Sequence, residues 1–124
     1  MAHEKQLEDL KAGWAALAAG EMDKLASFYS EDMIFVLPGQ DDVLKGRTAF
    51  RAALDSIGQA LPPGFDITDL RYCPGDNEIM NVIEFTSEKL PNGSQCAVLF
   101  KFNSDDKIIE ERWFVDTKQW KTAF

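Results

Sequence analysis

The fold is decided by residues 95–116, which read QCAVLFKF (95–102), NSDD (103–106) and KIIEERWFVD (107–116). Two runs rich in β-branched and aromatic residues flank a short polar turn, a pattern that predicts an antiparallel hairpin. Side chains alternate between the two faces of a strand. One face of the second strand carries Glu110, Arg112, Phe114 and Asp116, and the other carries Glu111, Trp113 and Val115. We expect the face that ends in Asp116 to border an apolar hollow beneath covering helices.

Upstream of this hairpin, apolar residues recur mostly at helical spacing. They predict helices over residues 4–19, 22–29 and 48–57. Residues 33–37 are β-branched and aromatic, which predicts a short buried strand that ends at Pro38-Gly39. The first half of the chain is therefore mainly helical.

From Phe65 onward the chain has the pattern of a β-meander. Strands are expected over residues 65–72, 79–89, 95–103 and 107–116, joined by turns rich in Pro, Gly, Asn and Asp. Helices followed by antiparallel strands predict an α+β fold. A length of 124 residues fits one domain, residues 1–124, with a core of its own.

Charge and composition limit the kinds of molecule that this protein is expected to bind. Lys and Arg total 13 against 21 Asp and Glu, and the net charge of −8 disfavours nucleic acid and anionic membranes. Cys73 and Cys96 lack zinc or redox spacing, so we expect no metal; free thiols are favoured, although their pairing stays open. The apolar run 12–19 follows several charges, unlike a signal peptide, so a cytoplasmic location is expected.

Several short segments, in this order and spacing, carry a family resemblance. They are Ala19-Gly20-Glu21-Met22-Asp23-Lys24-Leu25, Phe28-Tyr29-Ser30-Glu31-Asp32-Met33-Ile34-Phe35, Pro38-Gly39, Lys45-Gly46-Arg47-Thr48-Ala49, and Asp106-Lys107-Ile108-Ile109-Glu110 followed by Asp116. With them the chain resembles the NTF2-like (nuclear-transport-factor-2-like) superfamily, more closely its SnoaL-like, polyketide-cyclase-like branch. The resemblance implies a cone-shaped, curved antiparallel sheet wrapped by N-terminal helices, an internal pocket and frequent dimerisation. Family members include enzymes and non-enzymatic binders.

The resemblance gives one candidate catalytic residue. Asp116 lies where the cyclase-like branch has its acid/base aspartate, on the last strand. A ketosteroid-isomerase mechanism is disfavoured, because Leu37 occupies the place of that subfamily's base. The sheet histidine of the cyclases also has no counterpart, since the only histidine is His3. The alternative role for Asp116 is the N-cap of a short terminal helix, because the residues after it match a capping box.

Bulky side chains at structural spacing are the candidates for the pocket wall. Apolar walls would raise the pKa of an acid/base carboxyl. The predicted pocket residues, besides Asp116, are Trp14, Tyr29, Phe35, Leu37, Val98, Phe100, Arg112 and Phe114. The alternative for each aromatic residue is a place in the ordinary core.

Trp113 lies on the opposite strand face from Asp116. If no other element covers that face, it forms an apolar patch on the outside of the sheet, so Trp113 is the predicted homodimer contact; an isolated surface tryptophan is the alternative. The leading hypothesis is a homodimer that binds a small, mostly hydrophobic molecule and, if it is an enzyme, transfers a proton without a cofactor through Asp116. A carrier or sensor without chemistry and an assembly module are the alternatives.

Overall fold

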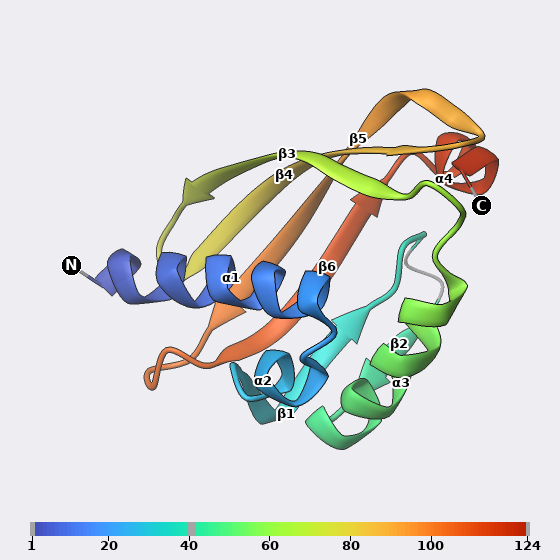
Figure 1. Cartoon of the computed structure of the whole chain (residues 1–124). Helices are drawn as coiled ribbons and strands as arrows, with labels where there is room; N and C mark the ends of the chain where they lie inside the picture. Colours follow the sequence, from blue (N-terminus) through green and yellow to red (C-terminus); the bar gives the residue numbers. More distant parts are fainter. Residues whose placement is uncertain (1, 40–41, 124) are drawn as a thin grey trace.

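The computed structural model describes residues 2–39 and 42–123 (Figure 1). The helices are α1 (Ala2–Ala19), α2 (Met22–Ala26), α3 (Arg47–Ala60) and α4 (Thr117–Ala123). The strands are β1 (Tyr29–Val36), β2 (Val43–Lys45), β3 (Asp66–Pro74), β4 (Glu78–Ser87), β5 (Leu90–Phe102) and β6 (Ile108–Val115). This is the expected α+β order of helices followed by a long meander.

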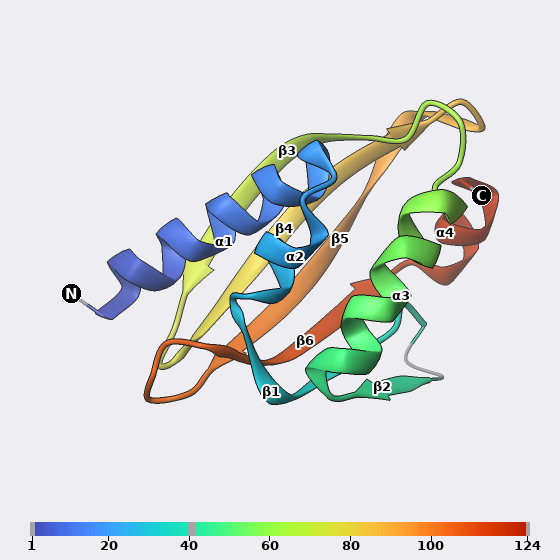
Figure 2. The ribbon, with the colours of Figure 1, turned by 60° about the horizontal axis from the view of Figure 1, so that its bottom comes forward.

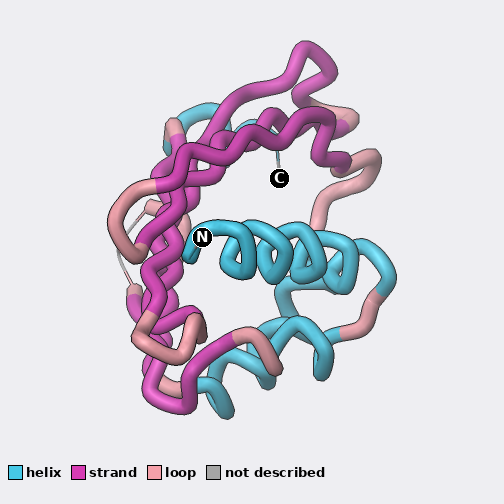
Figure 3. The backbone as a smooth tube through the Cα atoms, turned by 90° about the vertical axis from the view of Figure 1, so that its left-hand side faces the viewer, coloured by secondary structure: helices cyan, strands magenta, loops and turns pink. Residues whose placement is uncertain are grey.

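The strands form one curved sheet in the order β2-β1-β6-β5-β4-β3. Neighbouring strands are antiparallel except β1 and β6, which run parallel. α1 crosses the concave face of the sheet, and α2 and α3 continue the cover on the same side (Figures 1 and 2). Viewed from the end, the sheet bends around α1 without closing (Figure 3). The curvature leaves room between the sheet and the helices.

The core fills most of this space with large apolar side chains. Phe50 from α3 and Phe85, Ile79 and Ile83 from β4 are at most 2% exposed. The inward positions of β4 alternate strictly with partly exposed ones, as one covered sheet face requires. Side chains of this kind each gain about 1.5–3 kcal/mol on full burial, so the covered face is the main source of stability.

A β-bulge sets which face of β6 points inward. Phe102 pairs with Ile108 and Lys101 with Glu110, so Ile109 is an extra residue in the ladder. After this insertion Glu111 pairs with Phe100, a core residue of β5, and shares its face. The prediction that the Asp116 face turns inward is therefore wrong. Strand alternation was read correctly, but the opposite face is the covered one.

Several element boundaries also differ from expectation; in particular β5 begins at Leu90 rather than Gln95, so residues 91–93, expected as a turn, lie within the strand. The second helix ends at Ala26, and Tyr29 already begins β1, whose pairing with β6 extends the strand beyond residues 33–37. β2 is a three-residue strand held by pairing with β1, and nothing in its short sequence distinguishes it from a loop. Within the described part of the chain, the helices are too short or too polar for any of them to span a bilayer.

Candidate functional site

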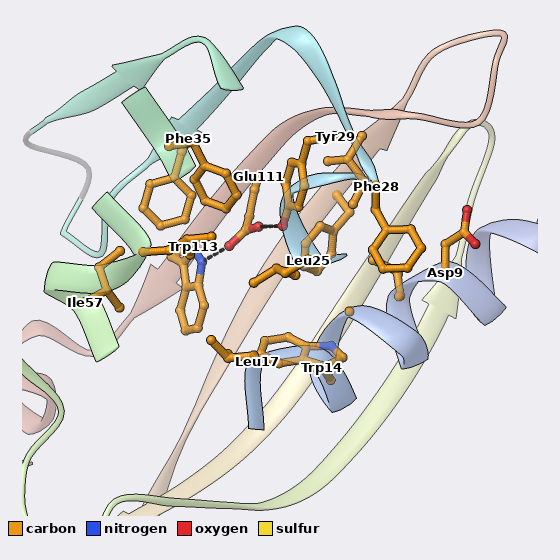
Figure 4. A pocket seen from close by; sticks show the side chains of 16 residues that line it. Asp9, Trp14, Leu17, Leu25, Phe28, Tyr29, Phe35, Ile57, Glu111 and Trp113 are labelled. Atoms are coloured by element: carbon orange, nitrogen blue, oxygen red, sulfur yellow. Dashed lines mark hydrogen bonds between the residues drawn. The ribbon is translucent and has the colours of Figure 1, made fainter. Parts of the chain in front are cut away.

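A cavity opens between the concave sheet face and α1, α2 and α3 (Figure 4). Its volume is about 80 Å³. The lining residues are Asp9, Leu10, Gly13, Trp14, Leu17, Leu25, Phe28, Tyr29, Phe35, Phe50, Leu54, Ile57, Phe100, Ile108, Glu111 and Trp113. The walls are thus mostly aromatic and aliphatic, with two carboxylates among them.

Aromatic rings in edge-to-face contact form one wall. The ring centroids of Trp14 and Trp113 are 6.4 Å apart, and those of Trp14 and Phe100 are 6.3 Å apart. The indole Nε1 of Trp14 donates to Oδ1 of the fully buried Asn81 at 3.4 Å, which holds the Trp14 ring against β4 and β5. Such edge contacts add about 0.5–1.5 kcal/mol to the area buried, so this wall is firmly held.

Glu111 is the buried acid of the site. Its side chain comes from the inward face of β6 and points into the group of rings (Figure 4). The Tyr29 hydroxyl donates to one carboxylate oxygen, and Trp113 Nε1 donates to the other at 2.6 Å. Burial raises the pKa of Glu111 to about 7, although both hydrogen bonds favour the charged form. Protonated and ionised Glu111 are therefore both available near neutral pH.

Tyr29 keeps its proton at this site. The first position of β1 brings it beside the start of β6, where it pairs with Ile108. Burial and the adjacent Glu111 carboxylate raise the pKa of the Tyr29 hydroxyl well above its ordinary value. Tyr29 is therefore a fixed hydrogen-bond donor at physiological pH.

Asp9 is the second carboxylate of the lining. It extends from α1 close to Phe28, away from the Glu111 cluster (Figure 4). Its carboxylate accepts a hydrogen bond from Lys5 Nζ at 2.7 Å, one helical turn earlier, and its side chain is 19% exposed. Asp9 is thus partly hydrated and charge-paired, whereas Glu111 is neither.

The sequence-predicted pocket residues separate into two groups. Trp14, Tyr29, Phe35 and Phe100 line the cavity. The others lie elsewhere: Val98 is a buried core residue, Leu37 packs against the core, Arg112 pairs with Glu110 and Phe114 is 38% exposed. Arg112 and Phe114 miss the cavity because their strand face is the outer one.

Trp113 and Asp116 also lie differently from the expectation. Trp113 lines the cavity, so it is not the outward-facing contact predicted for a dimer. Asp116 is exposed, and its Oδ1 accepts hydrogen bonds from the backbone N–H groups of Lys118 and Gln119 at 3.0 and 3.1 Å. The alternative role of Asp116, the N-cap of a terminal helix, is confirmed. Because Asp116 does not line the cavity, we assign it no chemical role.

Glu111 was missed because a glutamate on a strand is usually solvated. The signal that could have found it is Trp113, two residues later on the same face, whose indole N–H needs a partner when buried. No candidate metal site is found in the described chain: residues 2–39 and 42–123 contain no group of three or more His, Cys, Asp or Glu side chains arranged to hold a metal ion.

Comparisons with solved structures identify the same architecture in other proteins. Bal32a from a soil-derived mobile gene cassette has 23% sequence identity and a TM-score of 0.80, covering 99% of this chain and 98% of that one. A candidate polyketide cyclase from Xanthomonas campestris pv. campestris has 15% identity and a TM-score of 0.79, with 99% and 98% covered. An NTF2-like protein of unknown function from Burkholderia xenovorans LB400 has 26% identity and a TM-score of 0.68, with 93% and 85% covered.

Sequence comparison extends this result. No curated protein matches the chain. The model of the SnoaL-like domain matches residues 10–111, which span α1 to the buried glutamate of β6. The match covers most of the chain and agrees with the sheet, the helical cover and the resemblance of the short segments. The chain belongs to the family of SnoaL-like domains, within the NTF2-like fold.

Proposed function

We propose that this protein binds a small, mostly apolar molecule in the cavity and that Glu111 is its polar anchor. One observation carries the proposal: a buried carboxylate lies at the wall of a cavity whose other lining residues, apart from Asp9 and Gly13, are aromatic or aliphatic. Ligand sites in proteins combine such walls with a few placed polar groups and titratable residues of shifted pKa.

The cavity size sets the scale of the ligand. Its volume of about 80 Å³ is about half that of an engineered cavity of ~150 Å³ that binds benzene in another protein. Gly13 lines the cavity in the middle of α1, where a Cβ would lie 3.3 Å from Leu25 Cδ1. Glycine inside a helix costs about 1 kcal/mol relative to alanine, so its presence is consistent with space being needed there. The proposed ligand is therefore no larger than one small ring with a polar substituent.

A screen with compact probes tests the proposal. Cyclopentanone and cyclopentanol are added to 15N-labelled protein, and the indole N–H signals of Trp14, Trp113 and Trp120 are followed by NMR. We expect Trp14 and Trp113 to shift and Trp120, which lies outside the lining, to shift less. Gly13→Leu, which fills the cavity, should abolish these shifts. Binding that persists in Gly13→Leu, or shifts confined to Trp120, would contradict the proposal.

Proton transfer is the second candidate function, and the pKa of about 7 for Glu111 favours it. A general acid or base works best when its pKa is near the working pH, and it contributes about 10²–10⁴-fold to rate. With bound cyclopentanone, Glu111 would take a proton from the carbon next to the carbonyl, and the C–H electron pair would move towards the carbonyl oxygen. Return of deuterium from D2O would complete the exchange.

The exchange of hydrogen for deuterium in cyclopentanone separates an enzyme from a carrier. For an enzyme, the wild-type protein accelerates exchange, Glu111→Gln loses at least about 100-fold of that acceleration and Glu110→Gln retains it. For a carrier, cyclopentanone binds but exchanges at the buffer rate. The carrier is favoured because the hydrogen bonds from Tyr29 and Trp113 stabilise the ionised carboxylate of Glu111 and so make it a weaker base.

A homodimer and a cytoplasmic location remain predictions. With Trp113 turned inward, the exposed aromatic residue on the outer face of β6 is Phe114. We propose that a dimer would use this outer face. Sedimentation equilibrium of the wild-type protein and of Phe114→Glu tests this: a dimer that Phe114→Glu dissociates supports it, and a wild-type monomer contradicts it.

A further inference from the structure

The charged groups of the cavity all have one sign. Among the described residues that line it, Asp9 and Glu111 are charged, and both are acidic; Lys, Arg and His are absent from this lining. The whole chain carries a net charge of −8. A carboxylate or phosphate ligand would enter this cavity against like charge and without a cation to receive it.

Glu111 is also buried without a cation of its own. Its partners within residues 2–39 and 42–123 are the neutral donors of Tyr29 and Trp113, and it takes part in none of the ion pairs formed there. Buried charges in proteins are usually paired or bound to metal, because burial removes their hydration. An ionised Glu111 is therefore prepared for a positive group that enters the cavity.

The aromatic wall suits such a group. Trp14, Trp113 and Phe100 lie next to one another around the cavity, and Trp113 also contacts the carboxylate of Glu111. A cation over the face of an aromatic ring is attracted by the negative charge of that face, most strongly over tryptophan. Carboxylate and rings together offset much of the hydration that an alkylammonium ion loses on entering.

We propose that the ligand is a small apolar amine whose protonated nitrogen pairs with Glu111 while its hydrocarbon part packs against Trp14 and Phe100. This assignment rests on the proposed function, because it requires the cavity to be the binding site. It names the chemical class of the ligand and excludes anions of the same skeleton. Tyr29 and Trp113 hold the carboxylate in place, whereas Asp9, the other acid of the lining, is already paired with Lys5.

Three probes with one skeleton test the proposal: cyclopentylamine, cyclopentanol and cyclopentanecarboxylate. Affinities are measured at pH 8 from the indole N–H shifts of Trp14 and Trp113. We expect the amine to bind at least tenfold more tightly than the alcohol, and the carboxylate more weakly than the alcohol. In Glu111→Gln the amine should lose its advantage, so that amine and alcohol bind within about threefold of each other. Glu110→Gln, the matched control on the outer face, retains the wild-type order.

A pH series on the wild-type protein gives a second test that needs no variant. Cyclopentylamine stays protonated between pH 5.5 and pH 8, whereas Glu111 gains a proton over that range because burial raises its pKa to about 7. The affinity of the amine should fall at least tenfold on lowering the pH to 5.5, and that of the alcohol should change little. Glu111 faces Tyr29, Trp113 and the cavity, with Asp9 as the other charged group of the lining.

The outcomes separate the two claims. Equal or tighter binding of the alcohol or the carboxylate would overturn the amine assignment and leave the cavity as a binding site. An amine preference that survives both Glu111→Gln and pH 5.5 would also overturn it, because the nitrogen would then pair elsewhere. Absence of indole shifts with every probe would contradict the proposed function itself, and the amine assignment would fall with it.

Discussion

Glu110 and Glu111 are neighbours on one strand and have opposite surroundings. Glu110 faces outward, where its Oε2 lies 3.2 Å from Arg112 Nε and 3.7 Å from Lys101 Nζ. Glu111 faces inward, is 6% exposed and has Tyr29 and Trp113 as partners. Strand alternation alone separates them. The comparison shows that the covered face of β6 gives its glutamate a shifted pKa and a place in the cavity.

Replacing each of the two glutamates by alanine should give the largest difference in stability between them. Glu111→Ala leaves the Tyr29 hydroxyl and the Trp113 indole N–H buried without an acceptor, and orphaned buried groups cost about 1–3 kcal/mol each. The truncated side chain also leaves an empty space, which adds to this cost. Together, these effects should lower the free energy of unfolding by about 4 kcal/mol at pH 5. Glu110→Ala should cost less, about 1 kcal/mol, because Glu110 is 14% exposed but its partners Arg112 and Lys101 are 33% and 44% exposed and stay hydrated without it. Urea denaturation measures both; equal losses would refute the comparison.

The pH dependence of stability should differ in the same way. Burial raises the pKa of Glu111 from 4.5 to about 7, so the folded chain holds a proton that the unfolded chain has released between these values. The stabilisation is complete below about pH 4.5 and is lost as the pH rises through about 7. The wild-type protein should lose about 2–3 kcal/mol from this group between pH 5 and pH 8, and Glu111→Gln should not show this loss. Glu110→Gln should keep the wild-type slope; a Glu111→Gln slope like the wild type would contradict the assignment.

Tyr29→Phe sharpens the comparison by removing one partner of Glu111. The Tyr29 hydrogen bond lowers the pKa of Glu111, so its loss should move the titration midpoint upward from about 7. Stability should fall by about 1–2 kcal/mol, the usual cost of a lost hydrogen bond to a charged or buried group. Side-chain carboxyl NMR gives the midpoint and urea denaturation gives the stability. A midpoint that moves downward would contradict the hydrogen-bond assignment.

Asp116→Ala should have the smallest effect and leave the cavity unchanged. The N-cap of α4 is lost, which costs about 1 kcal/mol. Cyclopentanol affinity should equal that of the wild-type protein, because Asp116 does not line the cavity. Asp116→Asn, which keeps a capping oxygen, is the matched control and should retain most of the stability. If both variants lost affinity for cyclopentanol, the conclusion that Asp116 lies outside the binding site would be contradicted.

The sequence alone was enough to predict the α+β order of the elements, the family and much of the aromatic wall of the cavity. Spacing and resemblance identified Trp14, Tyr29, Phe35 and Phe100, because bulky residues on covered elements point to the interior. The inward face of β6 could not be read, since strand alternation is symmetric and the deciding bulge at Ile109 is a property of pairing with β5. That one choice of face accounts for the errors at Arg112, Trp113 and Phe114.

The most direct test of this account is the titration of Glu111 itself. Protein labelled with 13C at the glutamate side-chain carboxyl is followed by NMR from pH 4 to pH 9, and Glu111→Gln assigns the signal. We expect one glutamate to titrate near pH 7, as burial beside Tyr29 and Trp113 requires. If the signal that disappears in Glu111→Gln titrates near the ordinary value of 4.5, Glu111 is solvated, and its role as buried anchor of the cavity is contradicted.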